Sequence, residues 1–351
     1  MVILLGTLLH VGTELTASAL TFTANNHLAR AAEYLKRGDA QAAFAALDAA
    51  DRALQRSLPF TARPGWRGIE TGDVKTYQIW TKVLRTRLDW LKPDPSAESF
   101  AAFLSRNKAE YDRTAERFTE VTARGLRLLD RDPFILRDLV QQHLQDANIA
   151  VGLANEELLL AATTRAHTAI KALHHFEPFS AEVYLLEADL AAIQGLKAQG
   201  IAEAALSAYA EAEVYANRAT YIDPTFPEAF VVLATYQNEQ VVRGSADTPN
   251  LVPKICRNYA RAEQLGLALS QDDLLIYATN LFLAGQVSDA IRTGARLEPE
   301  RRTALKDQVR NIFRVYHRST AELERTLKLL DAGDLPATPS TVPASPLLDL
   351  R

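Results

Sequence analysis

Three histidines in one predicted helical stretch are the side chains most capable of binding a metal ion or transferring protons. His174 and His175 follow His167 at spacings of seven and eight, which places them loosely on the same side of a helix as His167. A zinc site needs three or four ligands that converge at fixed distances, often with two of them one turn apart. Lys171 occupies the intervening turn, and its ammonium group would repel a cation. We therefore predict that these histidines pack at the surface or between helices and hold no metal.

The remaining reactive side chains show no pattern typical of a catalytic centre. Cys256 is the only cysteine, so the chain has no Cys-x-x-Cys pair, and we interpret it as a buried helical thiol. The sequence contains no phosphate-binding Gly-rich loop and no nucleophile elbow. Acidic pairs such as Glu156-Glu157 and Asp272-Asp273 are consecutive, so their side chains diverge on a helix and favour helix N-termini over proton sharing. We predict a protein that is not an enzyme and needs no cofactor.

The most regular charged pattern is a row of five basic residues spaced four apart, which we call the basic row. Each member is turned by about 40° beyond a full turn from the previous one. Like charges one turn apart destabilise an isolated helix by roughly 0.2–0.5 kcal/mol per pair. An acidic protein surface, lipid phosphates or RNA would relieve this repulsion, and so would the acidic middle of the chain, a second copy or solvent. The row is Arg302, Lys306, Arg310, Arg314 and Arg318, and Leu305, Val309, Ile312, Phe313 and Tyr316 form the opposing apolar face.

Five acidic-Pro pairs, each at the end of a long helical pattern, divide the chain into units. Their prolines are separated by 38, 45, 46 and 75 residues. The last interval is close to two periods, and Leu265-Gly266 can end a helix within it in place of a proline. Recurrent stops of this kind predict an array of helix-turn-helix units. The pairs are Asp94-Pro95, Asp132-Pro133, Glu177-Pro178, Asp223-Pro224 and Glu298-Pro299.

The clearest unit runs from His27 to Arg56. Apolar residues recur at helical spacing on both sides of Gly38-Asp39, and many of them are alanines that let two antiparallel helices approach closely. Gly38 can adopt the left-handed conformation that ends the first helix, and Asp39 can cap the second. We therefore predict a helix pair with its turn at these two residues.

This unit resembles a tetratricopeptide repeat. In that family a Tyr precedes a Gly by four residues, a small residue follows five later, and a second Ala closes the unit before a Pro. The family period is about 34 residues, so the longer intervals here indicate extended helices or inserts. Residues 57–95 fit the pattern poorly, and residues 96–131 predict one nearly continuous helix. The matching residues are Tyr34, Gly38, Ala43 and Ala50; then Ala219, Phe230, Leu233 and Ala234; then Leu274, Tyr277, Ala278, Leu281, Gly285 and Ala290; and, less closely, Tyr184, Ala188 and Gly195.

The resemblance implies an all-α, right-handed superhelical α-solenoid of antiparallel helix pairs with an irregular helical middle. It also implies a concave groove lined by the first helix of each pair. The groove residues implied here are mostly acidic or neutral and lack the basic clamp that some family members use for a C-terminal carboxylate. A basic or neutral extended segment is therefore the expected ligand. The groove candidates are Glu182, Leu185, Asp189, Glu228, Thr235, Asn238, Glu239, Asp272 and Thr279.

The net charge of −4 is unevenly distributed along the chain. Residues 138–240 hold 14 Asp and Glu against 4 Lys and Arg, whereas the flanking parts are mildly basic. A general nucleic-acid binder needs a basic surface that follows the phosphate backbone. We therefore expect a protein or peptide partner and no DNA.

The first twenty residues are the most apolar stretch of the chain and allow two interpretations. Ala17-Ser18-Ala19 matches the cleavage site of a secretory signal peptide, but no Lys or Arg precedes Arg30, and Glu14 interrupts the apolar run. The uncharged stretch is also too short to span a bilayer. Residues 1–24 therefore form either an apolar helix that caps the array or a targeting or anchoring segment. The first predicts a cytoplasmic protein, and the second an envelope or periplasmic protein with membrane contact.

The predicted domain organisation follows from these segments. After residues 1–24 come a tetratricopeptide-like unit at 25–57, an irregular section with long helices at 58–160, and tetratricopeptide-like repeats at 161–331. Residues 332–351 contain four prolines among Ser, Thr and Ala, so we expect a disordered tail. The predicted function is a non-enzymatic scaffold or adaptor that binds a protein or peptide. The alternative is an envelope-associated binding component of a transport or assembly system.

Overall fold

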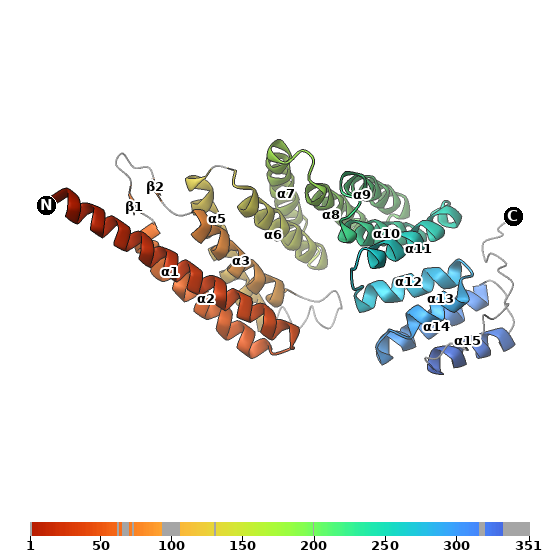
Figure 1. The fold of residues 1–351 in the computed structure, drawn as a ribbon. Coiled ribbons are helices and arrows are strands. Elements are labelled where there is room, and N and C mark those ends of the chain that lie inside the picture. Colours follow the sequence, from red (N-terminus) through yellow and green to blue (C-terminus); the bar gives the residue numbers. More distant parts are fainter. Residues whose placement is uncertain are drawn as a thin grey trace. The chain divides into compact units, whose positions relative to one another are not determined.

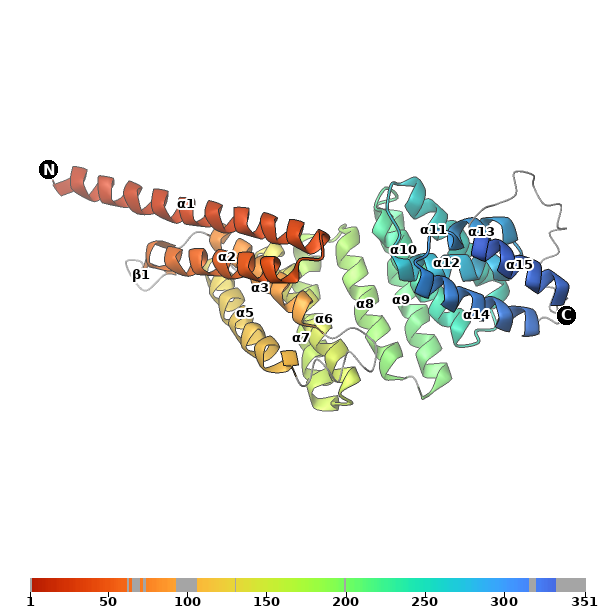
Figure 2. The ribbon, with the colours of Figure 1, turned by 90° about the horizontal axis from the view of Figure 1, so that it is seen from below.

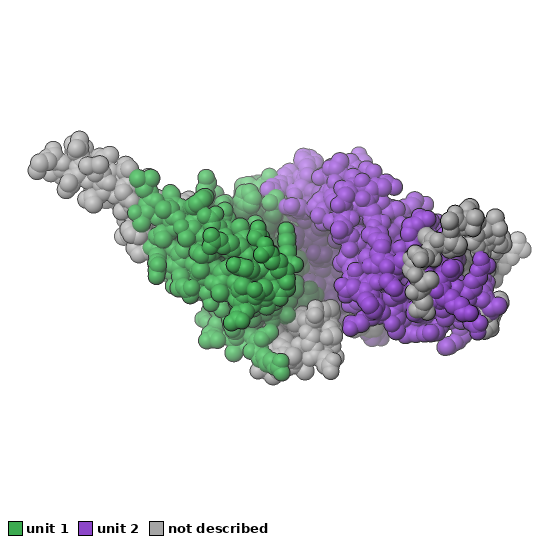
Figure 3. All heavy atoms as spheres, turned by 60° about the horizontal axis from the view of Figure 1, so that its bottom comes forward, with its two compact units in different colours: residues 1–176 green, residues 177–351 purple. Residues whose placement is uncertain are grey.

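The structure is a computed structural model that describes residues 2–61, 63–64, 70–71, 74–92, 106–129, 131–198, 200–315 and 320–332. Its described residues are almost entirely α-helical, and successive helices form antiparallel pairs (Figure 1). The chain divides into two compact units, unit 1 at Met1–Phe176 and unit 2 at Glu177–Arg351, coloured green and purple in Figure 3. The all-α solenoid class predicted from the sequence is confirmed.

The described elements of unit 1 are helices and two antiparallel strands of two residues each, in which Arg63 lies opposite Thr71. Its elements are α1 (Val2–Lys36), α2 (Ala40–Thr61), β1 (Arg63–Pro64), β2 (Glu70–Thr71), α3 (Val74–Leu91), α5 (Lys108–Leu128), α6 (Pro133–Gly152) and α7 (Glu156–Phe176).

The turn between α1 and α2 has the geometry that its sequence predicts. Gly38 has a φ of +74°, in the left-handed region that favours glycine, and the Asp39 carboxylate accepts a hydrogen bond from the Ala42 N–H at 3.0 Å. The two helices lie side by side in Figures 1 and 2. Ala31 and Ala50 are completely buried, which shows that small side chains allow the close approach of the pair.

The start of α6 explains one acidic-Pro pair. Asp132 accepts a hydrogen bond from the Ile135 N–H at 3.0 Å and another from Gln78 Nε2 of α3 at 2.8 Å, while Pro133 is the first residue of the helix. The pair therefore starts a helix and ties it to a neighbour. Pro299 likewise begins a helix, and Asp94-Pro95 lies outside the described residues.

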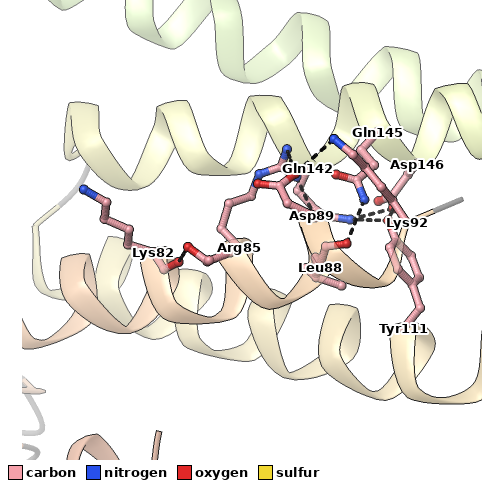
Figure 4. Close-up of polar contacts among 10 residues, drawn as sticks. Lys82, Arg85, Leu88, Asp89, Lys92, Tyr111, Gln142, Gln145 and Asp146 are labelled. Carbon is pink, nitrogen blue, oxygen red and sulfur yellow. Dashed lines mark hydrogen bonds and ion pairs between the residues drawn. The ribbon is translucent and has the colours of Figure 1, made fainter. Parts of the chain in front are cut away.

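A buried polar network joins α3, α5 and α6 (Figure 4). Gln142 lies at its centre: its Oε1 accepts from Arg85 Nη1 at 2.9 Å, and its Nε2 donates to Tyr111 Oη at 2.8 Å and to Asp146 Oδ1 at 2.7 Å. Arg85 also pairs with Asp89 at 2.9 Å. Because Gln142 is buried, unpaired amide atoms would be costly, and the network gives both of them partners.

Unit 2 is a series of helix pairs, and three of its turns use glycine at left-handed positions. Gly244, Gly266 and Gly285 have φ values of +78°, +91° and +75°. Gly266 follows the end of α11, as the sequence predicts for the long interval without a proline stop. The helices are α8 (Ala181–Lys197), α9 (Ala202–Ile222), α10 (Pro227–Val242), α11 (Thr248–Gln264), α12 (Gln271–Leu283), α13 (Val287–Gly294), α14 (Pro299–Val315) and α15 (Thr320–Ala332).

Gly195 differs from the turn glycines. Its match to the glycine of the tetratricopeptide pattern suggests that it ends a helix. It lies inside α8, and a Cβ atom built on it would come within 2.7 Å of the Tyr209 ring of α9. Both residues are buried. Its function is therefore to let α8 and α9 pack closely, with the tyrosine ring lying against the bare backbone.

Several predicted segments can be located in the structure. The predicted boundary at residue 24 lies within α1, which runs without a break from Val2 to Lys36. The described part of residues 96–131 includes α5, and residues 333–351 of the predicted tail lie outside the described residues. No helix in the described part of the chain is both long and apolar enough to cross a membrane.

Candidate functional site

The first helices of successive pairs in unit 2 are joined by side-chain contacts. Tyr236 Oη of α10 donates a hydrogen bond to Asp189 of α8. Asn280 Nδ2 of α12 donates to Asn238 Oδ1 of α10 at 2.8 Å. These contacts connect α8, α10 and α12 directly, without passing through the second helices.

Two further contacts join α12 to α14. Arg301 Nη2 lies 2.7 Å from Asp272 Oδ1, and Thr279 Oγ1 donates a hydrogen bond to Gln308. The contacting residues are seven positions apart on both helices, so α12 and α14 run in the same direction and in register. Together the four contacts define a continuous series across the first helices.

We call the surface that follows this series the ladder face. It carries the same pair of side chains on three helices: an acidic residue, then an apolar residue three positions later on the same side of the helix. The acids are exposed and the apolar side chains are partly buried. The ladder face consists of Glu182, Leu185 and Asp189 on α8; Glu228, Val231 and Asn238 on α10; Asp272, Leu275 and Thr279 on α12; and Arg301 and Gln308 on α14.

Asp189 has the most perturbed carboxyl group on the ladder face. Burial raises its pKa to about 6, and the hydrogen bond from Tyr236 partly opposes this increase. The pKa of Tyr236 is raised well above its usual value, chiefly by burial and then by the nearby charge of Asp189. The shared proton therefore stays on the tyrosine, and the pair forms a charge-assisted hydrogen bond between α8 and α10.

Two predicted groove residues contact the second helices instead. The Thr235 hydroxyl donates to the Val231 carbonyl at 3.0 Å and lies 3.5 Å from Tyr259 Oη of α11. Glu239 pairs with Arg243 at 3.0 Å, and that guanidinium lies 4.8 Å from the ring centre of Tyr209 on α9. These two residues therefore fix α10 against its neighbours.

The basic row has several different roles in the structure. Arg302 donates to the carbonyls of Ala295 and Leu297 at 2.9 and 3.0 Å, so it closes the C-terminal end of α13. Arg310 pairs with Asp307 on its own helix. The remaining members differ in exposure or lie outside the described residues: Lys306 is partly buried, Arg314 is exposed, and Arg318 is not described.

The apolar face of α14 is buried as predicted. Leu305 and Val309 are fully buried, and Ile312 and Phe313 are at most 9% exposed. Tyr316 lies outside the described residues. This face packs into the core shared with α12, while Arg301 and Gln308 lie beside it at the ladder face.

The candidate reactive residues are dispersed. His167 and His175 are exposed, and His175 packs edge-on against Phe176 with ring centres 5.2 Å apart. Cys256 is buried as predicted, and burial raises its pKa to about 12, so the thiolate is disfavoured. No group of three or more His, Cys, Asp and Glu residues that could hold a metal ion occurs in the described ranges.

The sequence pattern did not indicate Arg301 and Gln308 as members of the ladder face. The prediction for this segment relied on the regular four-residue spacing of the basic row, which does not include these two residues. A usable signal was present: Arg301 and Gln308 follow Pro299 with the seven-residue spacing that also separates Asp272 from Thr279. Only the packing of α14 on α12 makes that spacing meaningful.

Neither a protein-family model nor a curated protein matches this chain. Among solved structures, it is similar to the Schizosaccharomyces pombe nuclear import adaptor Nro1, with 11% identity, coverage of 93% of this chain and 97% of that chain, and a TM-score of 0.45. The chain is also similar to a second structure of Nro1, which is described as a hypoxic regulator of sterol synthesis and a nuclear import adaptor. The identity is 14%, the match covers 77% of this chain and 98% of that chain, and the TM-score is 0.34. Similarity at this level carries no information about function.

Proposed function

We propose that the protein is a non-enzymatic scaffold or adaptor that binds an extended protein segment on the ladder face of unit 2. We further propose that the helix pairs of this unit are tetratricopeptide-like. The observation that carries the proposal is the series of four side-chain contacts across α8, α10, α12 and α14. Such contacts hold several helices in register, so repeated side chains are presented at regular intervals.

The repeated acid and apolar residue define the chemistry of the ligand. Glu182, Glu228 and Asp272 offer carboxylates, and an apolar side chain follows each of them by three positions. Asp272 is already paired with Arg301, so its carboxylate contributes less negative charge to the face. A segment with Lys or Arg side chains between small apolar residues complements this pattern.

The helix spacing sets the spacing of the cations. Packed helices lie about 8–10 Å apart, and a chain in the polyproline II conformation advances roughly 3.1 Å per residue and returns to the same side at every third residue. Cations at every third residue would therefore reach the carboxylates of successive first helices. An enzyme active site would instead require convergent catalytic groups, and the ladder face presents its groups in a line.

A selection from displayed random 12-residue peptides tests the proposal. The wild-type chain is expected to enrich peptides with Lys or Arg at three-residue spacing. E228K should abolish that enrichment because it places a cation at the centre of the face. Enrichment of acidic peptides, or of no common sequence, would contradict the proposal.

E203K provides the matched control. Glu203 and Glu228 are both exposed acids in the first turn of a helix, on α9 and α10 respectively. Each substitution therefore has a similar effect on net charge and on the helix dipole. E203K should keep the wild-type selection, whereas equal loss in both variants would show that general charge, and not the ladder face, determines binding.

A further inference from the structure

Unit 1 contains a charged pocket between α2, α3 and α5. Its volume is about 260 Å³, and its wall includes Leu84 and five charged residues. Three of these are arginines and two are carboxylates, and the Asp48 carboxylate lies beside the pocket against Arg87. The charged residues are Asp51, Arg87, Glu110, Arg113 and Arg117.

Two of the arginines are already fixed by carboxylates. Arg87 donates to Glu110 and to Asp48 through its two terminal nitrogens. Arg117 lies 3.1 Å from Asp51, and its guanidinium stands 5.6 Å from the ring centre of Trp80. These contacts hold two of the cations in place through three carboxylates.

Arg113 is the cation whose charge is not balanced in this way. Its Nε donates to the Ala109 carbonyl of its own helix at 3.2 Å, and within the described residues its terminal nitrogens have no carboxylate partner. The side chain is exposed at the pocket. A planar guanidinium with two unused terminal nitrogens presents paired donors that match the two oxygens of a carboxylate.

We propose that this pocket binds a carboxylate group, with Arg113 as its anchor and Leu84 as the contact for the adjoining carbon atoms. Among the described lining residues, Arg113 is the arginine left for an anion, because the other two are paired with carboxylates. A phosphate dianion fits less well, because Asp51 and Glu110 would repel its second charge. The carboxylate can belong to a small organic acid or to the C-terminus of a peptide. This site lies in unit 1 and does not depend on the function proposed for unit 2.

Trp80 provides a local reporter for the test. Its indole Nε1 donates to Asp51 Oδ1 at 2.8 Å, next to the pocket. The chain has three tryptophans, so labelling with 5-fluorotryptophan gives three ¹⁹F resonances, which W66F and W90F assign. Sodium propionate is titrated into the full chain against sodium chloride at constant ionic strength. We expect a saturable shift of the Trp80 resonance with a Kd on the order of 1 mM.

R113A should weaken propionate binding by about tenfold or more, whereas R124A should leave it unchanged. Arg124 lies on the same helix but pairs with Glu120, away from the pocket. Circular dichroism checks that both variants are folded. A shift of equal size with chloride, a shift that does not saturate, or equal binding by R113A would overturn the proposal.

A second titration distinguishes the sources of the carboxylate. Ac-Gly-Ala with a free C-terminus is compared with its C-terminal amide. Tighter binding of the free acid than of propionate supports a peptide C-terminus, and equal binding supports a small organic acid. Equal binding of the acid and the amide would contradict carboxylate recognition altogether.

Discussion

At the scale of single residues, burial gives Asp189 properties that its sequence position does not indicate. The sequence identifies it as a polar groove residue on a helix. The structure places it against Tyr236 and raises its pKa to about 6, compared with the ordinary value of 3.8. The carboxylate therefore has a cost in the folded state, which its hydrogen bond only partly offsets.

This pKa predicts how stability depends on pH. Between about pH 6 and pH 3.8 the folded side chain holds a proton that the unfolded chain releases. The free energy of unfolding of the wild type should therefore rise, relative to D189N, on the order of 1 kcal/mol as the pH falls from 7 to 5. The asparagine keeps the acceptor for Tyr236. Urea denaturation at both pH values measures the difference, and parallel pH profiles for the two proteins would refute it.

Gly195 leads to a second prediction at this scale. In G195A the new methyl group would meet the ring of Tyr209, which is 2% exposed and cannot easily move. Crowding of this kind costs roughly 1–3 kcal/mol, and the better helix propensity of alanine returns at most about 1 kcal/mol. We expect a net loss of about 1–2 kcal/mol in the free energy of unfolding.

G200A is the control for G195A. Gly200 lies between α8 and α9, and a Cβ atom there would meet nothing within 4 Å. Its stability should stay within about 0.5 kcal/mol of the wild type. If both variants unfold at the same denaturant concentration, the contact between Gly195 and Tyr209 does not limit the packing of α8 on α9.

At the scale of elements, local signals predict where helices begin and end. Gly38, Asp39 and Gly266 behave as expected because their conformations depend only on neighbouring residues. Gly195 does not, because its role depends on a tyrosine in another helix. The polar network around Gln142 could not be predicted from the sequence either, because its members come from three different helices.

The N-terminal cap of α6 allows a test at this scale. D132A removes the acceptor for the Ile135 N–H and for Gln78 in a position that is 2% exposed. We expect a loss of about 1–3 kcal/mol in the free energy of unfolding, measured by chemical denaturation. The Asp223 carboxylate is only partly buried and bonds only within its own turn, to Thr225, so D223A should cost distinctly less. Equal losses would show that the link between α3 and α6 contributes nothing.

At the scale of the whole molecule, the sequence predicts the fold class better than the site. Helix ends marked by proline or glycine recur along the chain, together with helical periodicity. An error in a single unit therefore does not change the predicted fold class. The candidate site depends on which side chains meet across helices. Four predicted residues meet side chains of another first helix: Asp189, Asn238, Asp272 and Thr279. Two others, Thr235 and Glu239, contact second helices instead. The sequence did not indicate Arg301, the partner of Asp272.

The charge distribution predicts salt-dependent binding. Peptides obtained by selection on the wild-type chain should bind several-fold more weakly in 500 mM than in 50 mM sodium chloride, because exposed charges are screened over about 10 Å or less. E228K should bind weakly and show little dependence on salt. Isothermal titration at the two concentrations measures both effects. Binding that is unchanged by salt would indicate that apolar contacts dominate.

The most direct test of the proposed ladder face is to locate a bound peptide by photo-crosslinking. A selected peptide with a photoreactive residue beside its central cation is irradiated with the full chain, and the modified residues are identified by mass spectrometry. The account predicts modification of α8, α10 and α12 near Leu185, Val231 and Leu275. Modification confined to α9 and α11, or to unit 1, would contradict it.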